Sequence, residues 1–371
     1  MKNERNRIII KTSIIGIIAN VLLAAFKAAV GLAANSIAII LDAVNNLSDA
    51  LSSLITIVGT KLAGKRPDKK HPFGYGRIEY ISAMLVSAII LYAGITAAVE
   101  SVKKIIHPEA ADYSTLTFVI VGVAVVVKLI LGTYVKKQGK KANSGALEAS
   151  GADALFDAVL SLSVLASAVL FITTGISVEA WVGAVISVII IKAGIEMMLE
   201  TLNHILGNRA DKDTILKVKG LIAEEPEVRG AYDVALHNYG PDRDYAAAHI
   251  EVPDTMTVEK LDEITRSIQK RVYRETGIML QGLSVYSYNT NSDEAAAMRD
   301  RVNEIVTSNE WAIQTHGFYV DLENKEMRFD TVLSFDIHVD EALKTIRHQV
   351  HEVYPEYDVV ISPDINMSEV E

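Results

Sequence analysis

Residues 41–53 read LDAVNNLSDALSS and residues 148–160 read EASGADALFDAVL, and each segment lies inside a long apolar run. Each segment contains two oxygen-bearing side chains spaced four residues apart. The pairs are Asn45 with Asp49, and Asp153 with Asp157. Residues at i and i+4 of a helix lie on one face, one turn apart. The two segments therefore predict two helices that each present a polar pair from one face.

The apolar runs around these pairs belong to a larger set. Six stretches are long enough to cross a bilayer core, which takes about 20 helical residues. Their expected ranges are 9–33, 36–62, 78–102, 114–136, 147–173 and 177–199. Hydrophobic residues make up 50% of the 371-residue chain, more than a soluble protein of this size usually needs. We therefore predict an α-helical membrane protein whose six transmembrane helices lie within residues 1–206.

Charge separates this region from the rest of the chain. Residues 1–206 carry 19 Lys and Arg against 14 Asp and Glu, whereas residues 207–371 carry 17 against 32. The basic segments are the N-terminus and loops 61–77 and 136–141, and Lys and Arg favour the cytoplasmic side of short loops. We expect a multi-pass protein of the cell membrane, with both termini in the cytoplasm.

The acidic region also limits the kinds of partner. It lacks the clustered Lys and Arg that bind nucleic-acid phosphates, so nucleic acid is not expected as a partner. The chain has no cysteine, which excludes disulfides and thiolate metal ligands.

The sequence after His204 predicts two small α+β units. Residues 214–290 have the order helix, strand, turn, strand, helix, strand, which suits a sheet with helices on one face. A helix over 293–308 and the pattern that follows it repeat this order. The expected domain boundaries are 1–206, 207–291 and 292–371.

The paired polar residues indicate a metal site. An ionised carboxylate in lipid is expensive, so it normally faces a cavity, a partner or an ion. Two helices packed face to face would bring both pairs around a divalent cation, and small residues such as Gly151 and Ala154 allow close approach. The alternative is a set of isolated polar residues at helix contacts. Oxygen ligands suit hard ions such as Mn²⁺ or Mg²⁺, whereas Zn²⁺ is better held where imidazole or thiolate contributes.

Several motifs together resemble the cation diffusion facilitator family. They are NSIAIILDAVNNLSDALSSL (35–54), HPFGYGRIEY (71–80), the pair in residues 148–160, and VRGAYDV (228–234). The resemblance covers about residues 8–290. It implies a proton-coupled exporter of divalent metal with six transmembrane helices, a cytosolic ferredoxin-like domain that forms a homodimer, and no permanently bound cofactor. Residues 292–371 lie outside the common pattern and would form a second ferredoxin-like lobe.

The resemblance also implies site residues. The family's transport ligands fall on Asn45, Asp49, Asp153 and Asp157, and the three aspartates are the candidate proton carriers. Zinc members usually have a histidine where this chain has Asp153, so the all-oxygen set looks like the manganese branch. Zinc, iron or cobalt export by the same fold is the alternative.

Two further family sites are only partly matched. Asp68 and His71 match a second site in the loop, but Tyr75 stands where another histidine would be, so this site is expected to be weak or absent. In the soluble domain, the metal positions of zinc members retain only His249. Those positions are Tyr232, His249, Tyr286 and Tyr288.

The second lobe has its own candidates for a regulatory metal site. These are His316, Asp321, Asp330, Asp336 and His338, and the last two would share one face of a strand. A solvated acidic sheet edge is the alternative.

Charged residues elsewhere receive structural interpretations. Arg77 matches a family position that pairs the membrane and soluble domains by charge, although the matching partner position holds Asn208, with Asp211 as a substitute. We interpret three lysines in the apolar region as snorkelling or buried structural charges. They are Lys27, Lys128 and Lys192.

Two other classes of protein are alternatives. An intramembrane metal-dependent enzyme could hold ions between paired aspartates, but the denser sequence signatures of such enzymes are missing. A metal-sensing receptor would leave the depth of the site unexplained. A secondary active transporter is therefore expected rather than an enzyme.

Overall fold

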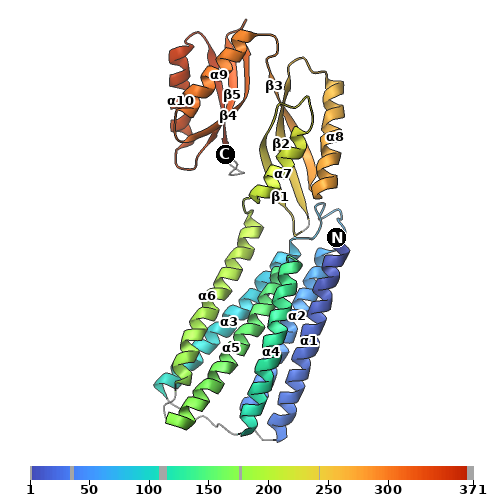
Figure 1. Ribbon diagram of the computed structural model, residues 1–371, viewed down its shortest axis with the longest axis vertical. Coiled ribbons are helices and arrows are strands. Elements are labelled where there is room, and N and C mark those ends of the chain that lie inside the picture. The colour runs from blue at the N-terminus through green and yellow to red at the C-terminus, as the bar shows by residue number, and fades with distance from the viewer. Residues whose placement is uncertain (1, 34–36, 108–114, 175–177, 242, 366–371) are drawn as a thin grey trace. The chain divides into compact units, whose positions relative to one another are not determined.

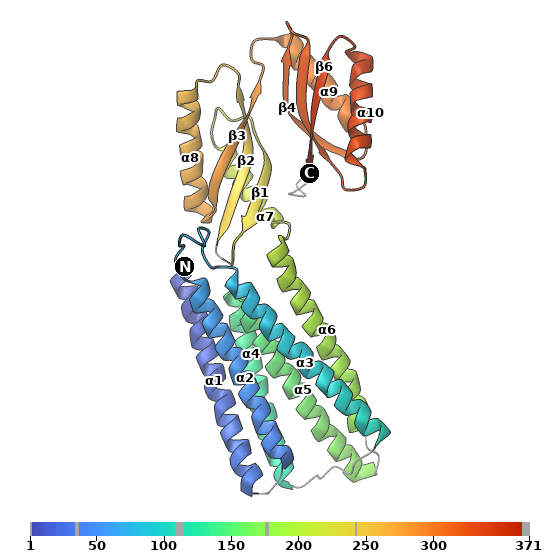
Figure 2. The same ribbon diagram turned by 180° about the vertical axis from the view of Figure 1, so that it is seen from behind.

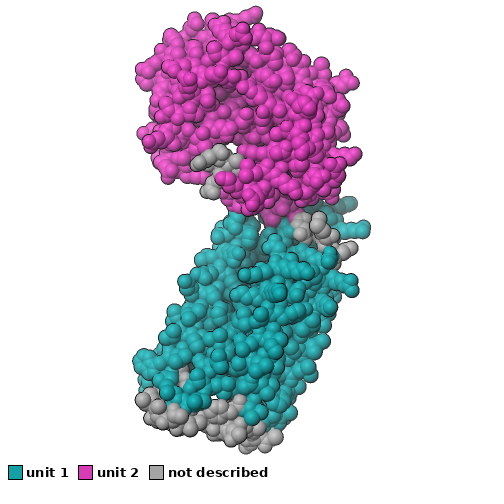
Figure 3. Space-filling view, in the orientation of Figure 1, with its two compact units in different colours: residues 1–208, 239–242 teal, residues 209–238, 243–371 magenta. Residues whose placement is uncertain are grey.

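The computed structural model describes residues 2–33, 37–107, 115–174, 178–241 and 243–365. The chain forms two compact units (Figure 3). Unit 1 comprises residues 1–208 and 239–242, and unit 2 comprises residues 209–238 and 243–371. The first is helical, and the second contains all of the β-strands that the structure describes (Figures 1 and 2).

Unit 1 is built from six long helices. They are α1 (Lys2–Ala33), α2 (Ile37–Ala63), α3 (Ile78–Ile106), α4 (Thr115–Lys141), α5 (Gly145–Thr174) and α6 (Glu179–Leu206). These correspond one to one with the six predicted stretches. Most extend beyond the predicted ranges, because polar residues at helix ends continue the hydrogen-bonded helix where the apolar run has stopped.

Four helical stretches are long and apolar enough to cross a membrane, judged over the described residues by length and composition. They are Glu4–Val30, Ile78–Ile106, Val119–Lys141 and Ala180–Leu206. Helices α2 and α5, which carry the polar pairs, are not among the four. Apolar side chains also lie on the outside of the bundle, where Leu22, Tyr92 and Trp181 are each more than 60% exposed. Such a surface suits lipid rather than water.

The helices of unit 1 pack mainly as three pairs, α1 with α2, α3 with α6 and α4 with α5. Glycines allow the α4–α5 pair to approach closely: a Cβ added at Gly151 would meet the backbone nitrogen of Lys136 at 2.5 Å. An ion pair joins α1 to α3, since Arg5 donates to both carboxylate oxygens of Glu79 at 2.6 and 3.0 Å. Arg5 also donates to the carbonyl oxygen of Ala142.

The first lobe of unit 2 has the predicted element order. It comprises α7 (Lys212–Ala223), β1 (Gly230–Asn238), β2 (Asp244–Pro253), α8 (Val258–Thr276) and β3 (Met279–Tyr288). Strand β2 is central, antiparallel to β1 and parallel to β3. Its alternating Ala246, Ala248, Ile250 and Val252 are buried, with Ile264 and Ile268 of α8 in the same core. The other face of the sheet therefore carries the intervening, more polar residues.

The second lobe repeats this plan. It comprises α9 (Asp293–Thr307), β4 (Ala312–Asp321), β5 (Glu326–Leu333), α10 (Val339–Val353) and β6 (Asp358–Ile365), with β5 antiparallel to β4 and parallel to β6. Its core is built around Phe329, which is fully buried. One strand prediction is wrong: β5 ends at Leu333, so Asp336 and His338 lie in the turn before α10 and share no strand face.

The two lobes meet through β3 and β4. Asn289, just after β3, acts as a substitute strand partner: its Nδ2 donates to the carbonyl oxygen of Val320 at 3.0 Å, and its Oδ1 accepts from the Val320 backbone nitrogen at 3.0 Å. Both backbone groups of Val320 are thereby satisfied by one side chain of the other lobe.

We predict that Asn289→Ala lowers the stability of unit 2 by about 1–3 kcal/mol, because it leaves the two backbone groups of Val320 without partners. Thermal unfolding of the detergent-solubilised protein measures this change. Asn324→Ala, in an exposed turn where the side chain bonds only Asp321, is the matched control and should shift the midpoint much less. Equal shifts for the two variants would contradict the linking role of Asn289.

Candidate metal site

Three aspartates of unit 1 converge between α2 and α5. Lys128 of α4 donates to Oδ2 of Asp49 and, at 2.8 Å, to Oδ2 of Asp157. Asp153 and Asp49 line one small cavity. Asp153 is 8% exposed, and the side chains of Asp49 and Asp157 are 13% and 23% exposed. The structure therefore brings the two predicted aspartate-bearing faces together.

Lys128 is the residue whose role the sequence did not reveal. Its side chain is 5% exposed and touches two carboxylates from different helices. The sequence interpretation as a buried structural charge did not include these contacts with Asp49 and Asp157. A single lysine in an apolar run looks the same in sequence whether it reaches lipid headgroups or an internal partner. Lys192 differs: its side chain is 76% exposed and lies 3.6 Å from Glu196 on the outside of α6.

The amide partner of the aspartates is only partly described. Asn45, predicted as a ligand, lies on α2, but its side chain is outside the described residues. The neighbouring Asn46 is 1% exposed. It lines a cavity of about 170 Å³ together with Lys27, Lys128 and Asp157. The i, i+4 spacing from Asp49 singles out Asn45 and gives no indication of a role for Asn46.

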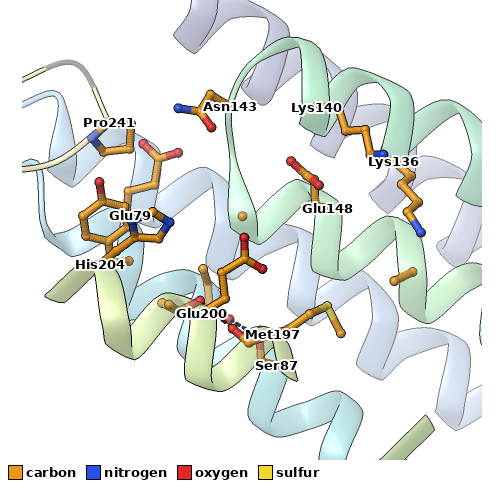
Figure 4. A pocket seen from close by; sticks show the side chains of 15 residues that line it. Glu79, Ser87, Lys136, Lys140, Asn143, Glu148, Met197, Glu200, His204 and Pro241 are labelled. Atoms are coloured by element: carbon orange, nitrogen blue, oxygen red, sulfur yellow. Dashed lines mark hydrogen bonds between the residues drawn. The ribbon is translucent and has the colours of Figure 1, made fainter. Parts of the chain in front are cut away.

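A larger cavity, of about 340 Å³, lies between α3, α4, α5 and α6 (Figure 4). Carboxylates from three helices, Glu79, Glu148 and Glu200, surround its space, and Lys136 lies along α4. Ala152, the neighbour of Asp153, also lines it. We name this cavity the acidic vestibule. Glu148 and Glu200 offer oxygen atoms that suit a hydrated cation, whereas Glu79 is paired with Arg5 and Lys136 and Lys140 also line the cavity.

The loop between α2 and α3 satisfies its own polar groups. Tyr75 donates to Oδ2 of Asp68 at 2.5 Å, and the backbone nitrogen of His71 donates to Oδ1 at 2.9 Å. The hydrogen bond from Tyr75, then that from His71, hold the pKa of Asp68 below its ordinary value. Asp68 and His71 do lie together, with 3.4 Å between Oδ1 and Nδ1, but Tyr75 occupies one side of the carboxylate.

Arg77 at the start of α3 contacts an aromatic ring. Its guanidinium lies 4.6 Å from the ring centroid of Tyr239, which stacks on Phe73. Tyr239 belongs to the four-residue segment that clusters with unit 1. Asp211, the substitute partner in the sequence analysis, caps α7 by accepting from the backbone nitrogen of Thr214 at 3.0 Å. The charge-pairing role of Arg77 stays a prediction.

Unit 2 contains a second cluster of ligand-type side chains. Nε2 of His316 lies 3.0 Å from Oδ2 of Asp233 and 3.1 Å from Oδ2 of Asp364. Nδ1 of His249 lies 3.0 Å from the same oxygen of Asp233. His316 is thus grouped with Asp233 and Asp364 among the described residues. The partners expected from the sequence are not part of this group; they are Asp321, Asp330, Asp336 and His338.

The ionisation of this cluster follows from its contacts. Burial lowers the pKa of His316, but its bonds with Asp233 and Asp364 outweigh burial and raise the pKa to about 9. Burial raises the pKa of Asp233, whereas contacts with His249 and His316 bring it well below the ordinary value. At neutral pH the cluster is therefore an imidazolium held between carboxylates.

Comparison with known proteins agrees with both halves of the chain. The profile of the cation efflux transmembrane domain matches residues 13–206, and that of the cation efflux protein cytoplasmic domain matches residues 210–281. The chain belongs to the cation efflux family. It is thus a metal transporter with a helical membrane domain and a cytoplasmic domain of helices and strands, and the predictions of family and fold class are confirmed.

Named relatives cover most of this cation efflux protein. An uncharacterized transporter of Methanocaldococcus jannaschii is 27% identical over 71% of this chain and 92% of its own. The manganese efflux system protein MneP of Bacillus subtilis is 26% identical over 74% and 94%. A cadmium, cobalt and zinc/H⁺-K⁺ antiporter of Bacillus velezensis is 22% identical over 64% and 76%. The matched cytoplasmic domain ends before the second lobe begins.

We predict that Lys128→Gln destabilises this cation efflux protein by about 3–5 kcal/mol, because two buried carboxylates lose their shared counter-charge. Lys192→Gln, which removes an exposed pair on α6, should cost at most about 1 kcal/mol. Thermal unfolding in detergent at fixed pH and salt compares the two. A Lys128 variant as stable as the Lys192 variant would show that the ammonium does not hold the aspartates together.

Proposed function

We propose that the chain exports a divalent metal ion, most readily Mn²⁺, in exchange for protons, and that Asn45, Asp49, Asp153 and Asp157 are the transport ligands. The carrying observation is that Asp49 of α2 and Asp157 of α5 share the ammonium group of Lys128, while Asp153 lines one small cavity with Asp49. Buried carboxylates from separate helices remain close only if positive charge neutralises them. A cargo ion supplies that charge in place of Lys128.

The preference for Mn²⁺ rests on ligand chemistry. All four proposed ligands offer oxygen, and oxygen donors suit Mn²⁺, whereas imidazole would favour Zn²⁺ and its neighbours. Similarity to MneP supports the same preference. Zn²⁺, Co²⁺ or Cd²⁺ is the second candidate cargo, because a relative at lower identity is named for those ions.

Proton coupling follows from ligands shared between metal and protons. A metal binds the ionised carboxylates of Asp49, Asp153 and Asp157, so protons arriving from the opposite side compete with it for the same oxygens. Lys128 adds a further exchange, because a dication that reaches both Asp49 and Asp157 must displace the ammonium. The site is then compensated in every state, by lysine, by metal or by protons.

In this proposal the acidic vestibule and the cytoplasmic domain also have roles in transport. The acidic vestibule is the route by which the cation reaches Asp153 from the side of the basic loops, which we place in the cytoplasm. The cytoplasmic domain forms a homodimer, and a twofold pair is the commonest symmetry for such assemblies.

Asp157→Ala should reduce Mn²⁺ uptake by proteoliposomes under a pH gradient by at least about tenfold. Removing a residue that only supports a metal ligand already lowers metal affinity or activity by about tenfold or more, and removing a ligand itself should lower it at least as much. The matched control is Glu196→Gln, a carboxylate on the outside of α6 that is 65% exposed and should leave uptake unchanged. Uptake by the Asp157 variant at the wild-type rate would falsify the assignment of the site.

Asp153→His should raise the ratio of Zn²⁺ to Mn²⁺ uptake, because imidazole favours Zn²⁺ over harder ions. The two ions are compared in the same vesicles at equal free concentration. Asp153→Asn, which keeps an oxygen donor and removes the charge, is the control and should slow both ions without raising the ratio. An unchanged ratio in the histidine variant would contradict selectivity by ligand type.

A further inference from the structure

The cluster around His316 joins the two lobes of unit 2. Asp233 comes from β1 of the first lobe, whereas His316 and Asp364 come from β4 and β6 of the second. The side chain of His316 is 1% exposed, while those of Asp233 and Asp364 are 16% and 28% exposed. The imidazole is therefore fixed in the interior, and the carboxylates reach solvent from which an ion can arrive.

Matching positions of the two sheets face one another here. In β1 and β4 the register shifts directly after Tyr232 and His316, respectively. Counting along the paired strands from these two residues, His249 of the first lobe occupies the position that Asp330 occupies in the second, and Tyr286 the position of Asp364. The rings of Tyr232 and His316 stack with centroids 4.7 Å apart. The second lobe thus carries His and Asp at two positions where the first lobe carries Tyr.

The His and Tyr side chains of the cluster are shared between its carboxylates. Nε2 of His316 has at most one hydrogen, but two carboxylate oxygens lie 3.0 and 3.1 Å away. Tyr286 also has one hydroxyl hydrogen, and its oxygen lies 3.0 Å from Asp233 and 2.8 Å from Asp330. Nδ1 of His249 also lies 3.0 Å from Oδ2 of Asp233, so this oxygen has three ring or hydroxyl groups around it and lies at the centre of the cluster. A cation that binds several oxygens at once would take the place of the hydrogens shared among these groups.

The spacing of these atoms suits such a cation. Neighbouring ligands at right angles around an ion with bonds of about 2.1–2.2 Å lie about 3 Å apart. The two measured distances from Nε2 of His316 to the carboxylate oxygens are 3.0 and 3.1 Å, and the three ligand atoms all lie within 4.8 Å of one another. A metal could replace the proton on Nε2 with little movement of the side chains.

We propose that Asp233, His316 and Asp364 bind a divalent transition-metal ion, and that the second lobe exists to complete this site on the first. One imidazole and two carboxylates suit Mn²⁺, Fe²⁺, Co²⁺ or Zn²⁺, whereas Mg²⁺ and Ca²⁺ prefer oxygen donors alone. Because the ligands come from both lobes, the bound ion fixes one lobe against the other. The site is separate from the transport aspartates and does not rest on the proposed cargo or its coupling.

The test is calorimetric titration of the full-length protein in detergent with Mn²⁺ and, separately, with Zn²⁺ and Mg²⁺. The transport site is removed by Asp49→Asn with Asp157→Asn, so that heat from binding reports on unit 2. We expect one equivalent of Mn²⁺ or Zn²⁺ to remain, with no comparable binding of Mg²⁺. In that background, His316→Gln and Asp364→Asn should each weaken the remaining affinity at least about tenfold.

Matched controls use the residues that the sequence suggested and the structure does not group with His316. Asp336→Asn and His338→Gln, in the same background, should leave the remaining equivalent unchanged. Thermal unfolding without added metal checks that each variant is folded. Asp364→Asn preserves side-chain shape at a partly exposed position, so it serves if His316→Gln does not fold.

Two results would overturn the proposal: no Mn²⁺ or Zn²⁺ binding once the transport aspartates are neutralised, or a remaining equivalent that His316→Gln and Asp364→Asn leave intact. Vesicle uptake is measured in parallel with an otherwise wild-type chain. If the protein with neutralised transport aspartates binds no Mn²⁺ or Zn²⁺ while the wild-type chain takes up metal normally, the His316 site alone is wrong. Retention of the equivalent in a chain that moves no metal would sink the proposed transport alone.

Discussion

Compensation of buried carboxylates by positive charge is the constraint on which unit 1 depends. Asp49 and Asp157 come from different helices, and each would be costly if left alone in an apolar bundle. Lys128 neutralises both, and the bond to each fixes α4 against α2 and α5. In the proposed transport cycle the same constraint selects for cations, because whatever replaces the ammonium must also bring positive charge. Under that proposal, structure and transport chemistry have one cause.

Unit 2 meets the same constraint differently. There the imidazole of His316, rather than an ammonium, lies between carboxylates of two lobes. Histidine can also donate a lone pair, so the compensating group can itself become a ligand, which lysine at its ordinary charge cannot do. The repeated α-β-β-α-β plan makes this arrangement possible, because equivalent strand positions of the two lobes come face to face.

Local pattern was sufficient for much of the fold and for part of the site. The i, i+4 spacing and the long apolar runs predicted the six helices and the approach of Asp49 to Asp153 and Asp157. The element order of both lobes also followed from periodicity. Contacts between distant segments were out of reach: nothing near Asp364 in the sequence connects it with His316 or Asp233. The turn at Asp336 was misjudged because alternation continued past the end of β5 at Leu333.

The sequence shows a lysine in the middle of an apolar run at position 128, but it does not show toward which neighbouring helix the side chain points. A helix buried on several sides gives no polar face from which to infer where one lysine points. Asn46 illustrates a related difficulty, because only the packing of neighbouring helices shows that its side chain lines a cavity with Lys128 and Asp157.

The tight contact between α4 and α5 at Gly151 makes the two contacts of Lys128 unequal. The backbones of α4 and α5 are so close at Gly151 and Lys136 that the two helices cannot slide past one another. Lys128 on α4 and Asp157 on α5 therefore move together as one rigid body. Asp49 rides on α2, which pairs with α1 instead. If the helix pairs shift against each other during a turnover, the Lys128–Asp49 contact parts and the Lys128–Asp157 contact persists. Asp49, a ligand in the proposed site, then changes its neighbours during the cycle while Asp157 keeps Lys128 as its partner.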